Sequence, residues 1–277
     1  MQVYDSVSEI IGKTPLVRLK GFGENLYGKC EFLNPSHSIK DRAAYAMIKK
    51  ALDEAHISKE TTIIECTSGN MGISLAMICA TLGLKIILTM PESMSIERRK
   101  MMALFGAKLE LTPASEGMKG AYERALALHK EIKNSFIPSQ FENLANKFAH
   151  RENTAVEILN DLDGKIDYFV AGFGTSGTIS GVGEVLKEKF ADKVKIIAVE
   201  PAASPLLSEG KAGGHKIQGI GANFIPKILN QSVIDEIQTI SNEDAIATAR
   251  ELALKNGLMV GISSGANVFI ASKIAKA

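Results

Sequence analysis

The hydrophobic positions of the chain alternate between short β-branched runs and longer segments with helical spacing. Between residues 61 and 133 this pattern predicts strands at 62–66, 85–89 and 108–112 and helices at 73–82, 96–105 and 118–133. From residue 146 it predicts strands at 167–171, 194–200 and 233–240 and helices at 146–162, 179–190, 242–255 and from 266. Strands that alternate with helices form parallel sheets covered on both faces. We therefore predict an α/β fold with two doubly wound lobes and mainly parallel sheets.

We expect the functional residues in the loops that follow the strands. In doubly wound sheets, ligands bind at the carboxyl ends of the strands, where the strand-to-helix loops lie. The stretch 205–226 is irregular and too long for a plain connection in a compact domain, so we also predict a functional loop there.

Composition excludes several classes of protein. Of the 277 residues, 32 are basic and 31 are acidic, so no overall field attracts nucleic acid. The five histidines and three cysteines lack the spacing of metal ligands or disulfides, and we expect no metal site. No apolar run reaches the roughly 18 residues of a membrane span, and the chain opens without the features of a signal peptide. These observations predict a cytoplasmic protein with no nucleic-acid or membrane partner.

Lys40 is the first candidate for a catalytic role. It stands where a loop broken by Pro35 meets an amphipathic helical segment. Because burial of a lysine cation is costly, a lysine at such a junction is either held out in water or held in for its chemistry. We expect Asp41 and Arg42 to pair with each other and to leave the Lys40 amine free to attack a carbonyl carbon. An ordinary solvated charge is the alternative.

Three glycine-bracketed loops lead into predicted helices, at 67–72, 172–178 and 261–266. Glycines let a backbone approach a ligand, and the amides at the start of a helix bind anions. The first loop suits a carboxylate and the second suits the phosphate of a cofactor, whereas ordinary turns and N-caps are the alternative for the first and third. The second loop also fits the dinucleotide pattern G-x-G-x-x-G, but it lies mid-chain. Together with Lys40, these loops predict a site for a phosphorylated aldehyde and an amino acid.

The motifs taken together closely resemble the cysteine synthase (O-acetylserine sulfhydrylase) family of fold type II pyridoxal phosphate enzymes, which includes cystathionine β-synthase. The resemblance rests on the lysine run, the three loops and the segments 12–16, 90–95, 140–141 and 215–221, which follow the family's order along nearly the whole chain. It implies a tryptophan synthase β-like fold. Residues 1–39 and 146–277 would form the larger cofactor-binding domain, and residues 40–145 the smaller, mobile substrate-binding domain.

The resemblance also implies a role for each candidate residue. Lys40 is the catalytic residue and binds pyridoxal 5′-phosphate covalently. The other cofactor-binding residues are Asn70 at the ring oxygen, Ser264 at the pyridine nitrogen, and Gly174, Thr175, Ser176, Gly177 and Thr178 at the phosphate. The substrate-binding residues are Thr67, Ser68, Asn70, Met71 and Gln140 at the carboxylate, with Gly219 near the amine.

The implied reaction is a β-replacement, carried out by a transferase of cysteine biosynthesis. O-acetyl-L-serine and sulfide give L-cysteine and acetate through an external aldimine and an aminoacrylate. The resemblance further implies a homodimer, and in many relatives serine acetyltransferase inserts its carboxyl terminus into the active-site cleft.

Three residues depart from the family's pattern. Met71 stands where Thr is usual, Ser176 where Gly is usual, and Asn223 where many cysteine synthases have Gly. A polar Asn223 could admit homocysteine or activate water, so cystathionine β-synthase or cysteine desulfhydrase activity, a lyase chemistry, is the alternative. A dinucleotide oxidoreductase and a non-catalytic binding protein are alternatives of other classes. Relatives also continue beyond Ala277 with a further strand, and we expect its loss to expose a neighbouring strand.

Overall fold

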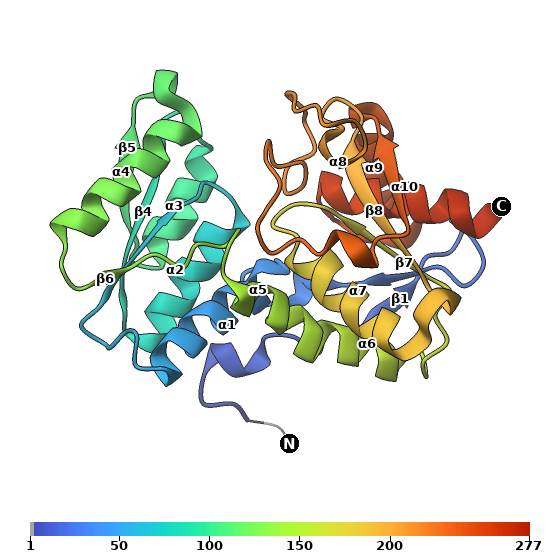
Figure 1. The fold of residues 1–277 in the computed structure, drawn as a ribbon, viewed down its shortest axis with the longest axis horizontal. Helices are drawn as coiled ribbons and strands as arrows, with labels where there is room; N and C mark the ends of the chain where they lie inside the picture. Colours follow the sequence, from blue (N-terminus) through green and yellow to red (C-terminus); the bar gives the residue numbers. More distant parts are fainter. Residues whose placement is uncertain (1–2) are drawn as a thin grey trace. The chain divides into compact units, whose positions relative to one another are not determined.

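The structure is a computed structural model that describes residues 3–277 and divides into two compact units (Figure 1). Unit 1 contains the segment up to Gly12 and Glu31–Asn146, and unit 2 contains Lys13–Cys30 and Lys147–Ala277. The sequence grouped residues 1–39 with 146–277, so the two divisions differ at residues 3–12, at residues 31–39 and at Asn146. In the structure Glu31 forms an ion pair with Arg42 in the first helix of unit 1, which joins residues 31–39 to unit 1. The assignment of cofactor and substrate to separate domains stays a prediction.

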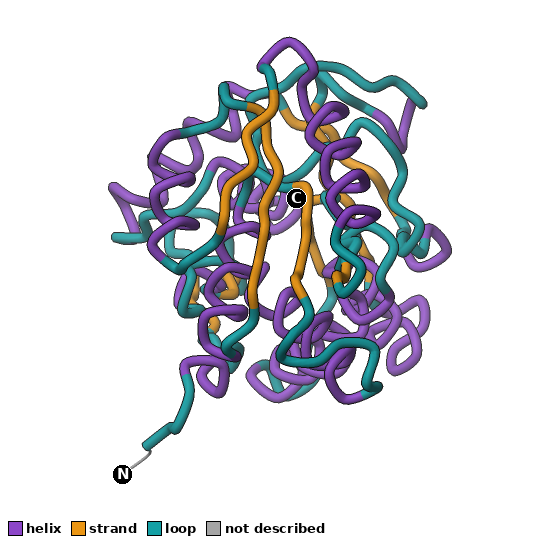
Figure 2. Tube along the Cα trace, turned by 90° about the vertical axis from the view of Figure 1, so that its left-hand side faces the viewer, coloured by secondary structure: helices purple, strands orange, loops and turns teal. Residues whose placement is uncertain are grey.

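Unit 1 is built on a four-stranded sheet in which every pairing is parallel. Its strands, in spatial order, are β5 (Lys108–Thr112), β4 (Lys85–Pro91), β3 (Thr62–Cys66) and β6 (Ser135–Phe136). Its helices are α1 (Lys40–Asp53), α2 (Asn70–Leu82), α3 (Ile96–Leu104) and α4 (Gly117–Glu131), with α5 (Leu144–Ala149) at the boundary of the unit. Figure 2 shows these strands between helices.

Helices cover both faces of this sheet because the side chains of each strand alternate between the faces. In β3, Ile63 packs into a core with α1 and α2, whereas the next residue, Ile64, packs with Ala125 and Leu128 of α4. Such strands read as continuous apolar runs, which is why the sequence pattern predicted them correctly.

The strand order places a topological switch point in unit 1. From β3 the chain proceeds to β4 and β5 on one side, but β6 pairs with the opposite edge of β3. Ligands of doubly wound sheets bind where the strand order reverses, outside the carboxyl ends of the two strands concerned. The loops that follow β3 and β6 are therefore the expected binding loops, and they contain Thr67 and Gln140.

Unit 2 contains a three-stranded parallel sheet and a small antiparallel pair. The parallel strands, in spatial order, are β7 (Tyr168–Gly172), β8 (Lys195–Pro201) and β9 (Glu236–Ile240), and the antiparallel strands are β1 (Leu16–Arg18) and β2 (Tyr27–Lys29). The helices are α6 (Ala155–Asp161), α7 (Gly177–Phe190), α8 (Leu206–Glu209), α9 (Asn242–Asn256) and α10 (Ile262–Lys276). In β8, Ile196 packs with Ile179 of α7, whereas Ile197 packs with Ala266 of α10, so helices cover both faces.

The structure corrects one predicted helix. The sequence predicted a single helix at 146–162, but the chain forms α5, then a π-helical turn at His150–Thr154, then α6. A π turn adds a residue to one helical turn without changing the hydrophobic character of the segment, so periodicity does not reveal it. Within residues 3–277, no helix is long and apolar enough to cross a membrane.

Candidate active site

Lys40 is the first residue of α1 in unit 1. Its side chain is half-buried, and burial lowers the pKa of the amine from 10.5 to about 8. A lysine with this pKa is partly neutral at mildly alkaline pH, and the neutral amine is both a nucleophile and a base. The amine therefore has the protonation behaviour that the predicted chemistry requires.

The residues after Lys40 take partners other than those expected. Asp41 accepts hydrogen bonds from the Ser36 amide at 2.7 Å and from the Ser36 hydroxyl, and the Arg42 guanidinium lies 2.7 Å from a Glu31 carboxylate oxygen. The prediction that Asp41 and Arg42 pair with each other was wrong, because consecutive residues of a helix do not face each other. Their partners hold the start of α1 in place.

A serine contact ties the start of α1 to α2. The Ser36 hydroxyl, which bonds to Asp41, lies 3.0 Å from the hydroxyl of Ser74, which is fully buried in α2. Asn70 begins α2 one turn earlier and is exposed. The structure thus holds the helix start that carries Lys40 against the helix that Asn70 opens.

The loop after β3 presents hydroxyl and amide groups, but not through Met71. Thr67 is buried, Ser68 is half-buried, and the backbone reaches α2 through Gly69. The Met71 side chain is only 2% exposed and belongs to the core of unit 1. Only its backbone amide is therefore available to a substrate carboxylate, and the missing threonine hydroxyl is not replaced by the sulfur.

A buried carboxyl group joins the two loops at the switch point. Glu65 of β3 accepts hydrogen bonds from the backbone amides of Ser139, at 3.0 Å, and Gln140. Asn146 also donates its side-chain amide to the Gln140 carbonyl oxygen at 2.8 Å. Burial raises the pKa of Glu65 from 4.5 to about 7. Gln140, which the sequence predicted at the substrate carboxylate, is thus held next to the β3 loop through its backbone.

In unit 2, the loop between β7 and α7 has the features of an anion site. Gly174 lies close to the connection between β8 and β9. A Cβ added at Gly174 would be 2.4 Å from the Gly219 carbonyl oxygen of that connection. Thr175 and Ser176 are buried, and the amides of the first turn of α7 follow directly. Helix starts of this kind bind phosphate through backbone amides and the helix dipole.

Ser176 supplies the observation that tests whether this loop fits a phosphate group. It has a φ of 71°, in the left-handed region, and is 3% exposed. Its hydroxyl oxygen is buried and has no hydrogen-bond partner among residues 3–277. Since buried polar groups are rarely left unpaired, a buried hydroxyl without a partner beside the start of α7 fits a site that an oxygen-rich anion completes. The donors present therefore fit the phosphate of a cofactor.

Two further predicted residues lie near this loop or on a neighbouring helix of unit 2. Gly219 has a φ of 99°, and a Cβ added there would lie 3.6 Å from the Ser263 hydroxyl oxygen. The Gly221 amide donates to the Phe173 carbonyl oxygen at 2.7 Å, which fixes this segment against the β7–α7 loop. Ser264 lies half-buried in the first turn of α10, next to Ser263. The positive φ explains why the sequence has glycine at position 219.

The structure therefore gathers the predicted residues in two groups. Unit 1 holds Lys40 together with Thr67, Ser68, Asn70, Met71 and Gln140, and unit 2 holds Gly174, Thr175, Ser176, Gly177, Thr178, Gly219 and Ser264. Among residues 3–277, the structure contains no cluster of three or more His, Cys, Asp or Glu side chains that could hold a metal ion.

Comparison with known proteins identifies the family of the chain. The sequence profile of the family described as "Pyridoxal-phosphate dependent enzyme" matches residues 7–277. The chain is 69% identical over 276 residues to cysteine synthase B of Campylobacter jejuni, and the match covers 100% of this chain and 92% of that protein. The chain belongs to the cysteine synthase family of pyridoxal-phosphate dependent enzymes. The fold type II α/β architecture and the cofactor follow from this membership.

Solved structures of this family include proteins with other activities. A hydrogen sulfide-producing enzyme from Fusobacterium nucleatum is 46% identical with a TM-score of 0.94, covering 99% of this chain and 93% of that one. An O-acetylserine dependent cystathionine β-synthase from Helicobacter pylori is 39% identical with a TM-score of 0.92, covering 100% of this chain and 92% of that one. Proteins that share this fold therefore catalyse more than one reaction.

Three site-related residues were missed by the sequence analysis. Glu65 lies within a buried strand, His150 lies in the π turn, and Asn267 lies on α10 with a buried side-chain oxygen that has no partner in the described part of the chain. Glu65 could have been identified from the run Thr-Ile-Ile-Glu-Cys, because a carboxylate in a strand that is buried on both faces needs buried partners. His150 and Asn267 gave no signal, because a single polar residue in a helical segment is ordinary.

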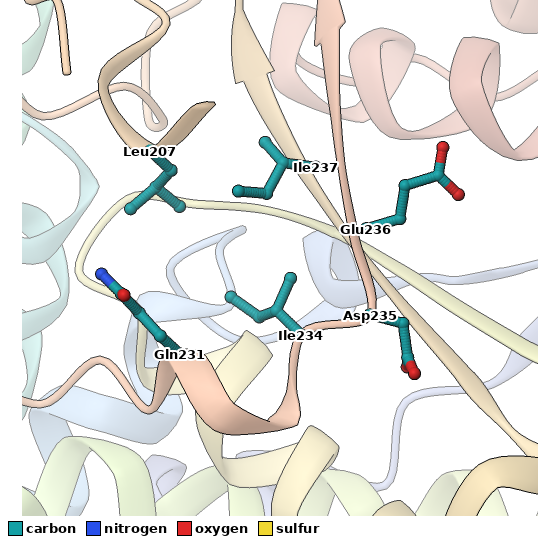
Figure 3. A pocket seen from close by; sticks show the side chains of 6 residues that line it. All are labelled: Leu207, Gln231, Ile234, Asp235, Glu236 and Ile237. Atoms are coloured by element: carbon teal, nitrogen blue, oxygen red, sulfur yellow. The ribbon is translucent and has the colours of Figure 1, made fainter. Parts of the chain in front are cut away.

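A cavity in unit 2 lies apart from these residues. It measures about 210 Å³ and is lined by Leu207, Gln231, Ile234, Asp235, Glu236 and Ile237. Figure 3 shows Leu207, Ile234 and Ile237 turned toward one another, whereas Asp235 and Glu236 point away. It adjoins β9, which lies at the opposite edge of the sheet from β7 and its phosphate loop. The cavity therefore does not belong to the candidate site.

Proposed function

We propose that the chain converts O-acetyl-L-serine and sulfide to L-cysteine and acetate. The observation that carries this proposal is the 69% identity to cysteine synthase B over the whole chain. The lowered pKa of Lys40 and the anion site at the start of α7 support it, because the reaction needs a basic amine and a held phosphate.

Lys40 is the group proposed to move the proton. When bound, pyridoxal phosphate supplies an electron-withdrawing ring that acidifies the Cα proton of the amino acid. The neutral Lys40 amine accepts that proton from Cα and later returns it. Burial favours this role, since it lowers the pKa of the amine to about 8 and raises the neutral fraction.

Binding residues of both units complete the proposal. Thr67, Ser68, Asn70, Gln140 and the Met71 backbone amide would bind the substrate carboxylate at the switch point of unit 1. In unit 2, the residues Gly174–Thr178 would hold the phosphate, with Gly219 near the substrate amine. The Ser264 hydroxyl would meet the pyridine nitrogen, where a neutral group stabilises the protonated ring less than a carboxylate would.

The test is a visible absorption spectrum of the purified protein, titrated first with O-acetyl-L-serine and then with sulfide. A yellow band that shifts on the first addition and returns on the second, with cysteine as the product, is expected. A band that responds to neither compound would refute the proposed reaction. Lys40→Ala is the control that must abolish the covalent cofactor band.

A different nucleophile is the second candidate, because Asn223 is an exposed polar residue. The similarity to a hydrogen sulfide-producing enzyme and to a cystathionine β-synthase supports it. Assays with sulfide, homocysteine and water as competing nucleophiles decide between the candidates. Asn223→Gly should lower the homocysteine or water reactions relative to the sulfide reaction if this residue selects the nucleophile.

Three further points belong to the proposal. We propose a homodimer, which light scattering tests, and binding of serine acetyltransferase through its carboxyl terminus, which a peptide titration tests. A cytoplasmic location also stays a prediction, and cell fractionation tests it.

A further inference from the structure

Two buried side chains of unit 2, those of His150 and Thr154, lie next to the phosphate loop and have no role in the proposed function. His150 Nδ1 lies 3.0 Å from the Thr154 hydroxyl oxygen, and His150 Nε2 lies 3.4 Å from the Thr178 hydroxyl oxygen. His150 and Thr154 are each 2% exposed. Thr178 is in the first turn of α7 and is one of the residues proposed to hold the phosphate.

The backbone brings His150 close to α7. His150 and Thr154 are the first and last residues of the π turn between α5 and α6. Where they meet α7 the chain has Gly181, at which an added Cβ would lie 2.4 Å from the Lys147 carbonyl oxygen and 3.0 Å from His150 Cβ. Figure 1 shows α6 beside α7, in agreement with their packing. The glycine therefore allows the close approach that brings the ring to Thr178.

The direction of the hydrogen bonds decides what this arrangement does. A hydroxyl has one proton, and a neutral imidazole carries a proton on only one of its two nitrogens. If Thr178 donates its proton to Nε2, it cannot donate the same proton to a phosphate oxygen. If Nε2 carries the proton and donates to Thr178, the Thr178 proton stays available to the phosphate.

We infer that His150 is a positioning residue that holds a proton on Nε2 and so keeps the Thr178 hydroxyl as a donor to the cofactor phosphate. Thr154 completes the arrangement, because its hydroxyl can donate to Nδ1 and thereby stabilise this tautomer. The inference rests on the proposed function, in which the first turn of α7 binds a phosphate group.

The first experiment reads the tautomer directly. Nitrogen-15 NMR of the histidine ring, with the His150 signals assigned by their loss in His150→Gln, is recorded on the protein loaded with pyridoxal phosphate. A proton on Nε2 is expected. An unprotonated Nε2 in the loaded protein overturns the inference, even if the cofactor is bound and the enzyme is active.

The second experiment measures the dissociation constant of pyridoxal phosphate and the phosphorus-31 shift of the bound cofactor. Thr154→Val keeps the shape of its side chain but removes the donor to Nδ1, and we expect several-fold weaker binding. His150→Phe removes every donor from the ring, and we expect about tenfold weaker binding, as for one lost hydrogen bond to a charged group. His150→Gln, which keeps an N–H donor, should bind more tightly than His150→Phe.

His129 offers a matched control. Its Nδ1 lies 2.9 Å from the Ser135 hydroxyl oxygen, so it forms the same kind of pair, but in unit 1 and exposed. His129→Phe should leave cofactor affinity and the phosphorus signal unchanged. If Thr154→Val and His150→Phe, once folded, also leave both unchanged, the inference is wrong. If the wild-type chain binds no pyridoxal phosphate, the proposed function itself fails.

Discussion

At the scale of single residues, burial shifts the pKa of the amine that we propose as the catalytic group. The Lys40 amine has a pKa of about 8 because it is desolvated, with no neighbouring cation required. The carboxyl group of the next residue, Asp41, has a pKa raised chiefly by burial, and the Ser36 hydroxyl and amide oppose that rise. The start of α1 thus carries a partly neutral amine and, one residue later, a carboxyl group with its own hydrogen-bond partners.

The first prediction concerns the pH dependence of Lys40. In the cofactor-free protein, the rate at which pyridoxal phosphate bonds covalently to Lys40 should rise with pH and level off above a midpoint near 8, because only the neutral amine reacts. Stopped-flow absorbance measures this rate. A midpoint near 10.5 would contradict the argument, and Lys40→Ala should remove the reaction altogether.

The second prediction concerns the cost of Ser176 in the absence of a ligand. A side chain at φ 71° is strained by roughly 1–2 kcal/mol, and a buried hydroxyl without a partner costs about 1–3 kcal/mol. In the cofactor-free protein, Ser176→Gly should therefore be more stable than wild type, and Ser176→Ala should gain only the hydroxyl part. Urea unfolding measures both variants.

The same two variants should bind pyridoxal phosphate more weakly, since both lack the hydroxyl. Ala191 provides the control, because it has a φ of 50° at the carboxyl end of α7 and carries no hydroxyl. Ala191→Gly should raise stability without any change in cofactor affinity. Tighter cofactor binding by Ser176→Gly would show that the hydroxyl does not serve the phosphate.

At the scale of elements, the hydrophobic pattern predicted the parallel strands other than β6 and most helices, because buried strands and amphipathic helices differ in period and length. It missed β1, β2 and β6, which are only two or three residues long, and the π turn at His150–Thr154. Missing β6 also hid the switch point, because that depends on which edge of β3 the short strand joins.

The sequence predicted only part of the candidate site. Its loops were visible because glycine and hydroxyl residues mark close approach and anion binding. Glu65, His150 and Asn267 were not, because their roles depend on which segments pack together and not on local sequence. Likewise, the sequence showed Met71 as a departure, but only the packing of α2 places its side chain in the core.

The third prediction concerns Glu65, the buried carboxyl group that connects β3 to the loop after β6. The folded-state pKa of Glu65 is about 7 against an ordinary 4.5, so the protonated form favours folding. This stabilisation is complete below about pH 4.5 and is lost as the pH rises through about 7. Glu65→Gln imitates the protonated carboxyl and does not titrate. Relative to wild type, it should therefore gain up to about 3 kcal/mol in unfolding free energy between pH 5 and 8.

Denaturant unfolding at several pH values measures this difference. Glu123→Gln, which removes an exposed carboxylate from α4 of the same unit, is the control for the loss of a negative charge. A stability difference between Glu65→Gln and wild type that stays constant with pH would show that Glu65 does not titrate in this range.

At the scale of the whole molecule, the candidate residues divide between two units with separate cores. Lys40 belongs to unit 1, whereas the proposed phosphate loop, its helix α7 and the His150 contact all belong to unit 2. Under the proposed function, the cofactor would have two anchors of different kinds, a covalent bond to Lys40 and hydrogen bonds from the α7 start. Removal of one anchor should leave the other intact.

The fourth prediction follows from this division and compares inorganic phosphate with pyridoxal phosphate as ligands of the cofactor-free protein. A ligand at 100 times its dissociation constant stabilises the folded state by about 2.7 kcal/mol. Phosphate should slow hydrogen exchange in α7 equally in wild type and Lys40→Ala, because its donors lie in unit 2. Pyridoxal phosphate should stabilise Lys40→Ala less than wild type, because the covalent anchor is lost. Thr178→Val should weaken the effect of both ligands, and a loss of the phosphate effect in Lys40→Ala would show that the two anchors are not independent.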